Sequence, residues 1–121
     1  MATKSEDIRA GDVTIWEPNP TYTREVVTIA VDAVNENLKV GQVMELDGSS
    51  YVVYASASEA VILLEDVDVS SETQEAVVLA RGPAVVSQDR LTYPAGTATT
   101  GKAALIANGI IPRDNPTYIN A

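Results

Sequence analysis

The sequence contains no histidine and no cysteine, and each absence excludes a class of chemistry. Without histidine the chain lacks the commonest general base and the commonest ligand of transition metals. This disfavours hydrolytic triads, zinc hydrolases and facial-triad iron enzymes. Without cysteine the chain forms no disulfide bond and no thiolate metal site. We therefore expect a protein that is not an enzyme, with no catalytic residues, no metal and no cofactor.

Basic residues are also few. Eight lysines and arginines stand against seventeen acidic residues, which gives a formal net charge of −9. Phosphate backbones and anionic membranes are bound by clustered lysine and arginine. Here the basic residues are scattered and form no run: Lys4, Arg9, Arg24, Lys39, Arg81, Arg90, Lys102 and Arg113. We expect neither nucleic acid nor membrane as a partner.

Long apolar segments are missing as well. No run approaches the ~20 apolar residues of a membrane span, and the opening MATKSED lacks the apolar stretch of a signal peptide. We therefore expect a soluble protein that is assembled in a cytoplasm. The 121 residues suit one small domain. Phenylalanine is absent and the apolar content is mostly valine, isoleucine, alanine and leucine, so we predict a mainly β fold.

The beginning of the chain differs in character from the remainder. Polar and charged residues dominate residues 1–23, and Pro18 and Pro20 hold their neighbours extended and end regular structure there. We predict that residues 1–23 form a flexible, extended N-terminal arm and that residues 24–121 form the β-rich domain.

Within this arm, residues 12–16 are β-prone and have few partners nearby in the sequence. Two alternatives are open: the segment adds a strand to a sheet edge of another chain, or it pairs with the protein's own sheet. Trp16, the only tryptophan, either anchors a binding surface or packs in the core.

The pattern of residues 24–121 predicts several short strands and one helix. Asp47-Gly48 predicts a hairpin turn, and the continuous apolar run 60–64 predicts a strand buried on both faces. A single helix is expected over residues 99–109, capped by Thr99 or Thr100 and ended by Gly109, with an extended tail after it. Strands are expected at 25–31, 42–46, 50–54, 60–64 and 75–81, with 84–86 continuing the last one past Gly82-Pro83.

Three patterns suggest chemistry, and each has a simpler explanation. The acidic stretch 65–72 lacks the central glycine of a calcium loop, so we interpret it as a solvated loop. Residues 96–102 have the glycine spacing of a phosphate loop, but Ala103 replaces the required hydroxyl. Tyr51, Tyr54 and Tyr93 are candidates to line a carbohydrate or small-ligand site, although tyrosines at strand ends are more often packing residues.

Several segments together resemble a known family. They are the apolar run 60–64, the acidic loop after it, the strand ending at 80–86, the segment 91–93, and 104–110. In these the chain resembles the head-decoration (capsid-stabilising) proteins of lambda-like tailed phages, over roughly residues 26–111. One departure is Ile62, where family members often carry glycine within the apolar run.

The resemblance implies a β-rich domain with few helices that assembles as a homotrimer. Such trimers sit at local three-fold positions on the outer surface of the expanded head, and their N-terminal arms order against the major capsid protein. It implies no small-molecule substrate. The alternative class is a carbohydrate- or ligand-binding β module on a virion or cell surface. Under the first interpretation, the expected capsid-binding residues are Asp12, Val13, Thr14, Ile15, Trp16 and Glu17.

Overall fold

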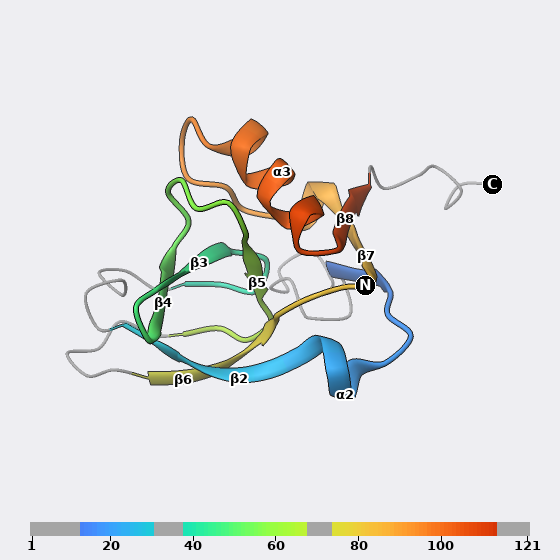
Figure 1. Ribbon diagram of the computed structural model, residues 1–121, viewed down its shortest axis with the longest axis horizontal. Coiled ribbons are helices and arrows are strands. Elements are labelled where there is room, and N and C mark those ends of the chain that lie inside the picture. The colour runs from blue at the N-terminus through green and yellow to red at the C-terminus, as the bar shows by residue number, and fades with distance from the viewer. Residues whose placement is uncertain (1–12, 31–37, 68–73, 114–121) are drawn as a thin grey trace, which may run out of the picture.

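A computed structural model describes residues 13–30, 38–67 and 74–113, and within these ranges the named elements form two sheets and three helical segments. The larger sheet is a closed five-stranded barrel, and the smaller sheet lies beside it together with helix α3 (Figure 1). The predicted mainly β fold is confirmed. The barrel has the order β2-β4-β3-β5-β6 and comprises β2 (Arg24–Ile29), β3 (Val43–Asp47), β4 (Ser50–Val53), β5 (Val61–Leu63) and β6 (Gln74–Leu79).

The second sheet has three strands and brings together distant parts of the chain. Its order is β1-β7-β8, so β1 and β8 are both edge strands. β7 pairs antiparallel with β1 and parallel with β8. The segment after the predicted helix is therefore more than an extended tail, because it supplies a strand. The sheet comprises β1 (Thr14–Trp16), β7 (Ala84–Ser87) and β8 (Ile110–Arg113).

The apolar run around β5 lies between two cores, which confirms the prediction of a strand buried on both faces. Val61 and Leu63 belong to the cluster that fills the barrel. Ile62, between them, points the other way and is fully buried against helix α3 and the small sheet. Because successive side chains of a strand point to opposite faces, one continuous apolar run serves both cores.

The Asp47-Gly48 turn is confirmed. Asp47 and Ser50 are paired residues of adjacent strands, and the turn between them requires a positive φ of 70° at Gly48. Glycine adopts this angle at little steric cost because it has no Cβ.

The helix prediction is confirmed for α3 (Ala98–Ala107), which is followed by Gly109 with a φ of +83°. Its N-cap residue is Thr97, so the helix begins before the predicted capping threonines. The expectation of a single helix is wrong. A short helix α2 (Pro20–Thr23) and a 3₁₀ turn η3 (Gln88–Arg90) are also present. α2 starts with Pro20, because the first turn of a helix does not need the N–H that proline lacks.

The prediction that residues 84–86 continue the preceding strand past Gly82-Pro83 is wrong. The chain leaves the barrel there, and β7 joins the small sheet. Gly82 meets Gly109 so closely that a Cβ on Gly82 would lie 1.7 Å from the carbonyl oxygen of Gly109. Beside this crossing, the Asn108 side-chain amide donates hydrogen bonds to the carbonyls of Ala60 (3.0 Å) and Ala80 (2.7 Å). The end of α3 is thereby fixed to the residue directly before β5 and the residue directly after β6.

Candidate functional site

Strand β1 pairs with the protein's own sheet, which decides between the two alternatives for this segment. The pairing with β7 is irregular: Thr14 lies opposite Val86 and Trp16 lies opposite Val85. In an uninterrupted antiparallel ladder Trp16 would lie opposite Ala84, whose side chain is buried. The bulge inserts Ile15 and turns Trp16 to the other face of the sheet.

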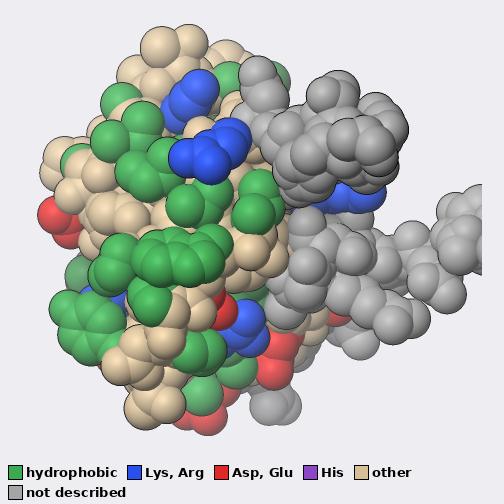
Figure 2. Space-filling model, turned by 90° about the vertical axis from the view of Figure 1, so that its right-hand side faces the viewer, with side chains coloured by type: hydrophobic (Ala, Val, Ile, Leu, Met, Phe, Trp, Pro, Cys, Tyr) green, Lys and Arg blue, Asp and Glu red, His purple; other side chains and the backbone are tan. Residues whose placement is uncertain are grey.

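The small sheet therefore has a buried face and an exposed apolar face. Residue pairing aligns Trp16, Val85 and Ile111 across the three strands. Trp16 is 52% exposed, Ile15 40% and Ile111 39%. Figure 2 shows the side of the molecule where this sheet lies, with hydrophobic side chains gathered over its middle. We call Ile15, Trp16, Val85 and Ile111 the outer apolar face.

The residues expected to bind the capsid differ in their burial and contacts. Asp12 lies outside the described residues. Val13 is fully buried in the core between barrel and sheet. The Thr14 hydroxyl oxygen is buried and has no hydrogen-bond partner among the described residues. Of these residues, only Ile15 and Trp16 are exposed large hydrophobic residues.

Glu17 belongs to an internal ion pair. Its carboxylate accepts hydrogen bonds from the Arg24 guanidinium at 2.8 to 3.1 Å and from the Thr23 hydroxyl. The Glu17 side chain is only 5% exposed. Burial raises the pKa of Glu17, but the hydrogen bonds from Arg24 and Thr23 outweigh it and hold the pKa below its ordinary value. The pair ties the end of β1 to the start of β2.

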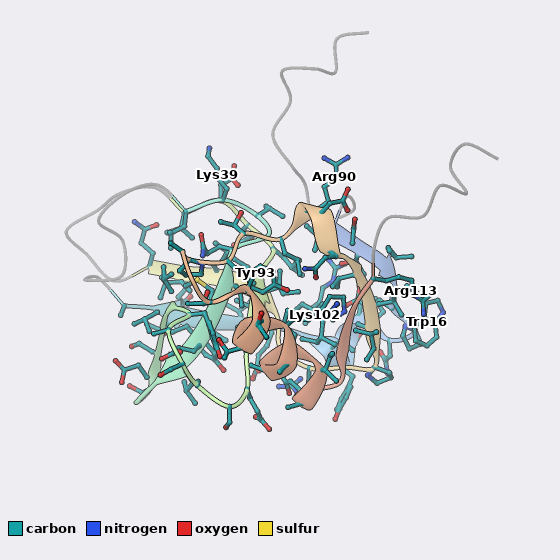
Figure 3. All side chains as sticks on the ribbon, turned by 90° about the horizontal axis from the view of Figure 1, so that it is seen from above. Trp16, Lys39, Arg90, Tyr93, Lys102 and Arg113 are labelled. Carbon is teal, nitrogen blue, oxygen red and sulfur yellow. The ribbon has the colours of Figure 1, made fainter. Side chains whose placement is uncertain are left out.

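The small sheet differs in charge from the rest of this acidic protein. Its strands read TIW, AVVS and IIPR, and none of these eleven residues is acidic. The barrel strands, by contrast, carry Glu25, Glu45, Asp47 and Glu75. Arg113 is exposed and forms no ion pair with any described residue. Trp16 and Arg113 project at the same end of the molecule (Figure 3).

The three tyrosines proposed as a ligand site do not meet at one place: Tyr54 and Tyr93 both lie near Gly101 in the core between barrel and small sheet, whereas Tyr51 packs against the barrel core. Tyr54 is 2% exposed and donates its hydroxyl to the Ala57 carbonyl at 2.8 Å. Tyr93 packs its ring on Gly101 of α3. Tyr51 borders a pocket of about 230 Å³. That pocket is lined by Leu46, Tyr51, Glu59, Val61, Ala80, Arg81 and Asn108.

The other patterns with a suggested chemistry have structural roles where they are described. Glu65 accepts a hydrogen bond from the Val77 amide, and Asp66 accepts one from the Val40 amide. Residues 68–72 of the acidic stretch lie outside the described residues. Within the described ranges no group of three or more acidic residues is placed to hold a metal. Gly101 lies inside α3 against Tyr93, where a phosphate loop would need an open turn.

Sequence reasoning missed the contributions of β7 and β8 to the exposed face. In the structure Ile110 and Pro112 of β8 are buried while Ile111 and Arg113 are exposed, but the residue types Ile-Ile-Pro-Arg do not show this alternation in the sequence. No local signal showed that this strand would share a sheet with β1. In the described part of the chain, no helix is long and apolar enough to cross a membrane.

Comparison with known proteins agrees with the resemblance noted in the sequence. A family model for bacteriophage lambda head decoration protein D matches residues 3–109. No curated protein matches the chain, and no solved structure does. The match extends well beyond residues 26–111 at the N-terminal side and includes β1. The chain belongs to the family of bacteriophage lambda head decoration protein D.

Proposed function

We propose that the protein is a structural cement of a phage head. It binds the expanded capsid as a homotrimer at local three-fold sites, on the outer surface, after synthesis in the host cytoplasm. Contact with the major capsid protein is made through β1. The observation that carries this proposal is the family match over residues 3–109, combined with the exposed apolar Trp16 on an edge strand inside the matched region.

The stabilisation follows from mass action. A protein that binds only the assembled, expanded lattice stabilises that state by RT ln(1 + [L]/Kd), which is about 2.7 kcal/mol at a free concentration one hundred times Kd. A trimer gains further, because its second and third contacts form at high effective concentration once the first is made. No bond is made or broken, so the protein needs neither catalytic residues nor a cofactor.

The exposed tryptophan supports β1 as a contact. Large aromatic side chains at the centre of an interface supply much of its binding energy, and contiguous exposed apolar patches mark interaction sites. Trp16 is held in place by the Glu17–Arg24 pair directly after it and by the pairing of β1 with β7. The contact is therefore preorganised, which lowers the entropy lost on binding.

The test is co-sedimentation of the purified protein with expanded, undecorated heads, with unexpanded proheads as control. We expect saturable binding to expanded heads alone and a raised temperature of head disruption. Equal binding to both lattices, or binding to neither, would contradict the proposal. Deleting residues 1–17 would also remove Val13 from the core and β1 from the sheet, so point variants give a sharper map of the contact.

The alternative is a ligand-binding module, supported by the pocket beside Tyr51. Binding to a glycan array in the absence of any binding to heads would favour this alternative over cementing.

A further inference from the structure

We propose that the capsid-binding surface extends across the whole outer apolar face and includes Val85, Ile111 and Arg113, which lie far from β1 in the sequence. The partner surface on the capsid protein is apolar, with a carboxylate facing Arg113. This inference rests on the proposed function, because it enlarges the same contact. It assigns a binding role to residues near the C-terminal end of the described chain.

The first argument is continuity. The β1-β7-β8 pairing puts Trp16, Val85 and Ile111 in one row, so a partner that covers Trp16 meets the other two. The sheet's opposite face is closed by the core, where Ala84, Val86 and Ile110 are buried. A partner can therefore approach this sheet only over its outer apolar face or along its two edges.

The second argument is charge. In a chain of net charge −9, the three strands of this sheet carry no acidic residue and one arginine. A surface without carboxylates on an otherwise acidic protein favours a partner surface that is apolar. Because the one charged side chain of this sheet is Arg113, the charge that the partner places nearest to it should be negative. Arg113 is available to such a partner, since no carboxylate of the described residues pairs with it.

The alternative occupant of the outer apolar face is a second copy of this chain. A three-fold ring needs two different complementary surfaces on each subunit, whereas a single patch that binds itself generates a two-fold dimer. The outer apolar face is one continuous patch. It supplies at most one of those two surfaces, so the particle mass of the variants described below decides between a capsid contact and a subunit seam.

The test compares two matched pairs of variants in head binding. Ile111→Ser removes an apolar side chain from the face, and Val26→Ser removes one that is 63% exposed on barrel strand β2. Arg113→Glu reverses a charge beside the face, and Lys102→Glu reverses an exposed charge on α3. We expect Ile111→Ser and Arg113→Glu each to raise the Kd for expanded heads about tenfold or more. The two control variants should change it less than threefold.

The outcomes separate this inference from the proposed function. If the unaltered protein does not bind expanded heads, the proposed function fails. If it binds and the Ile111 and Arg113 variants bind equally well, the contact is confined to β1 and this inference is wrong. If either variant changes the mass of the particle in solution by light scattering, the face is a subunit seam and the inference is again wrong. Thermal unfolding of every variant shows whether a loss of binding comes from misfolding.

Discussion

Trp16 lies opposite Val85 and not opposite Ala84, because the bulge at Ile15 shifts the pairing of β1 with β7 by one residue. This shift moves a large indole ring from the core side of the sheet to the exposed side. Bulges that redirect a side chain are common beside binding sites. The position of Trp16 is thus a consequence of strand register and invites direct tests.

Replacement of Trp16 by alanine should weaken head binding while leaving the fold intact. Half of this side chain is already exposed, so the free energy of unfolding should fall by no more than about 1 kcal/mol. The Kd for expanded heads should rise at least tenfold, as expected for an aromatic anchor. Co-sedimentation and thermal unfolding measure the two effects separately. Unchanged binding would exclude Trp16 from the contact.

Replacement of Glu17 by glutamine should destabilise the domain in a pH-dependent way. The pKa of Glu17 in the folded protein lies below its ordinary value of 4.5, so its ionised form stabilises the fold. This contribution is complete above the pKa of the unfolded chain and is lost as the pH falls through the lower folded pKa. At pH 7 the variant should lose about 1–3 kcal/mol, as for a hydrogen bond to a charged group.

Unfolding in urea across pH 2.5 to 7 measures this difference. The gap between Glu17→Gln and the unaltered protein should narrow as the solution becomes acidic. Glu59→Gln is the matched control, because Glu59 is exposed and forms no hydrogen bond or ion pair with a described residue. If the difference in the free energy of unfolding between Glu17→Gln and the unaltered protein does not change with pH, the ionised form of Glu17 adds nothing to stability.

Replacement of Gly82 by alanine should damage the junction between barrel and small sheet. The added Cβ would overlap the Gly109 backbone, so the chain crossing would have to open. We expect a loss of about 3 kcal/mol or more, in the range of severe steric changes in a core. Gly96→Ala is the control: its φ is +80° but its surroundings are open, so about 1–2 kcal/mol is expected from backbone strain alone. Equal melting temperatures for the two variants would contradict this account of the crossing.

Replacement of Ile62 by alanine should leave a cavity between the barrel and helix α3. Ile62 is fully buried in the cluster that joins them, so we expect a loss of about 2–5 kcal/mol. Val26→Ala, at a side chain 63% exposed, should cost less than about 1 kcal/mol. Chemical denaturation gives both values. A small effect at Ile62 would mean that the core readily closes around a missing side chain.

The sequence was sufficient to predict features that depend on local pattern. The strand around 60–64, the turn at Gly48 and the helix ended by Gly109 each follow from side-chain type and backbone preference over a few residues. The short helix at Pro20 was missed because proline is a breaker in most contexts and favourable only in a first turn.

The composition of the small sheet could not be predicted in this way. Nothing within β7 distinguishes a continuation of β6 from a strand of another sheet; the difference depends on contacts with β1 and β8. The outer apolar face could not be predicted for the same reason. Trp16 was a candidate from its chemistry, but its alignment with Ile111 requires two strand pairings and a bulge, all of them distant in sequence.

The two sheets also differ in when they can form during synthesis. Every barrel strand lies between Arg24 and Leu79, so the barrel can close before the rest of the chain leaves the ribosome. The small sheet needs the first and the last strands of the described chain on either side of β7. Its exposed row is complete only once Ile111 has been translated. A nascent chain would thus form a closed barrel before its outer apolar face is complete.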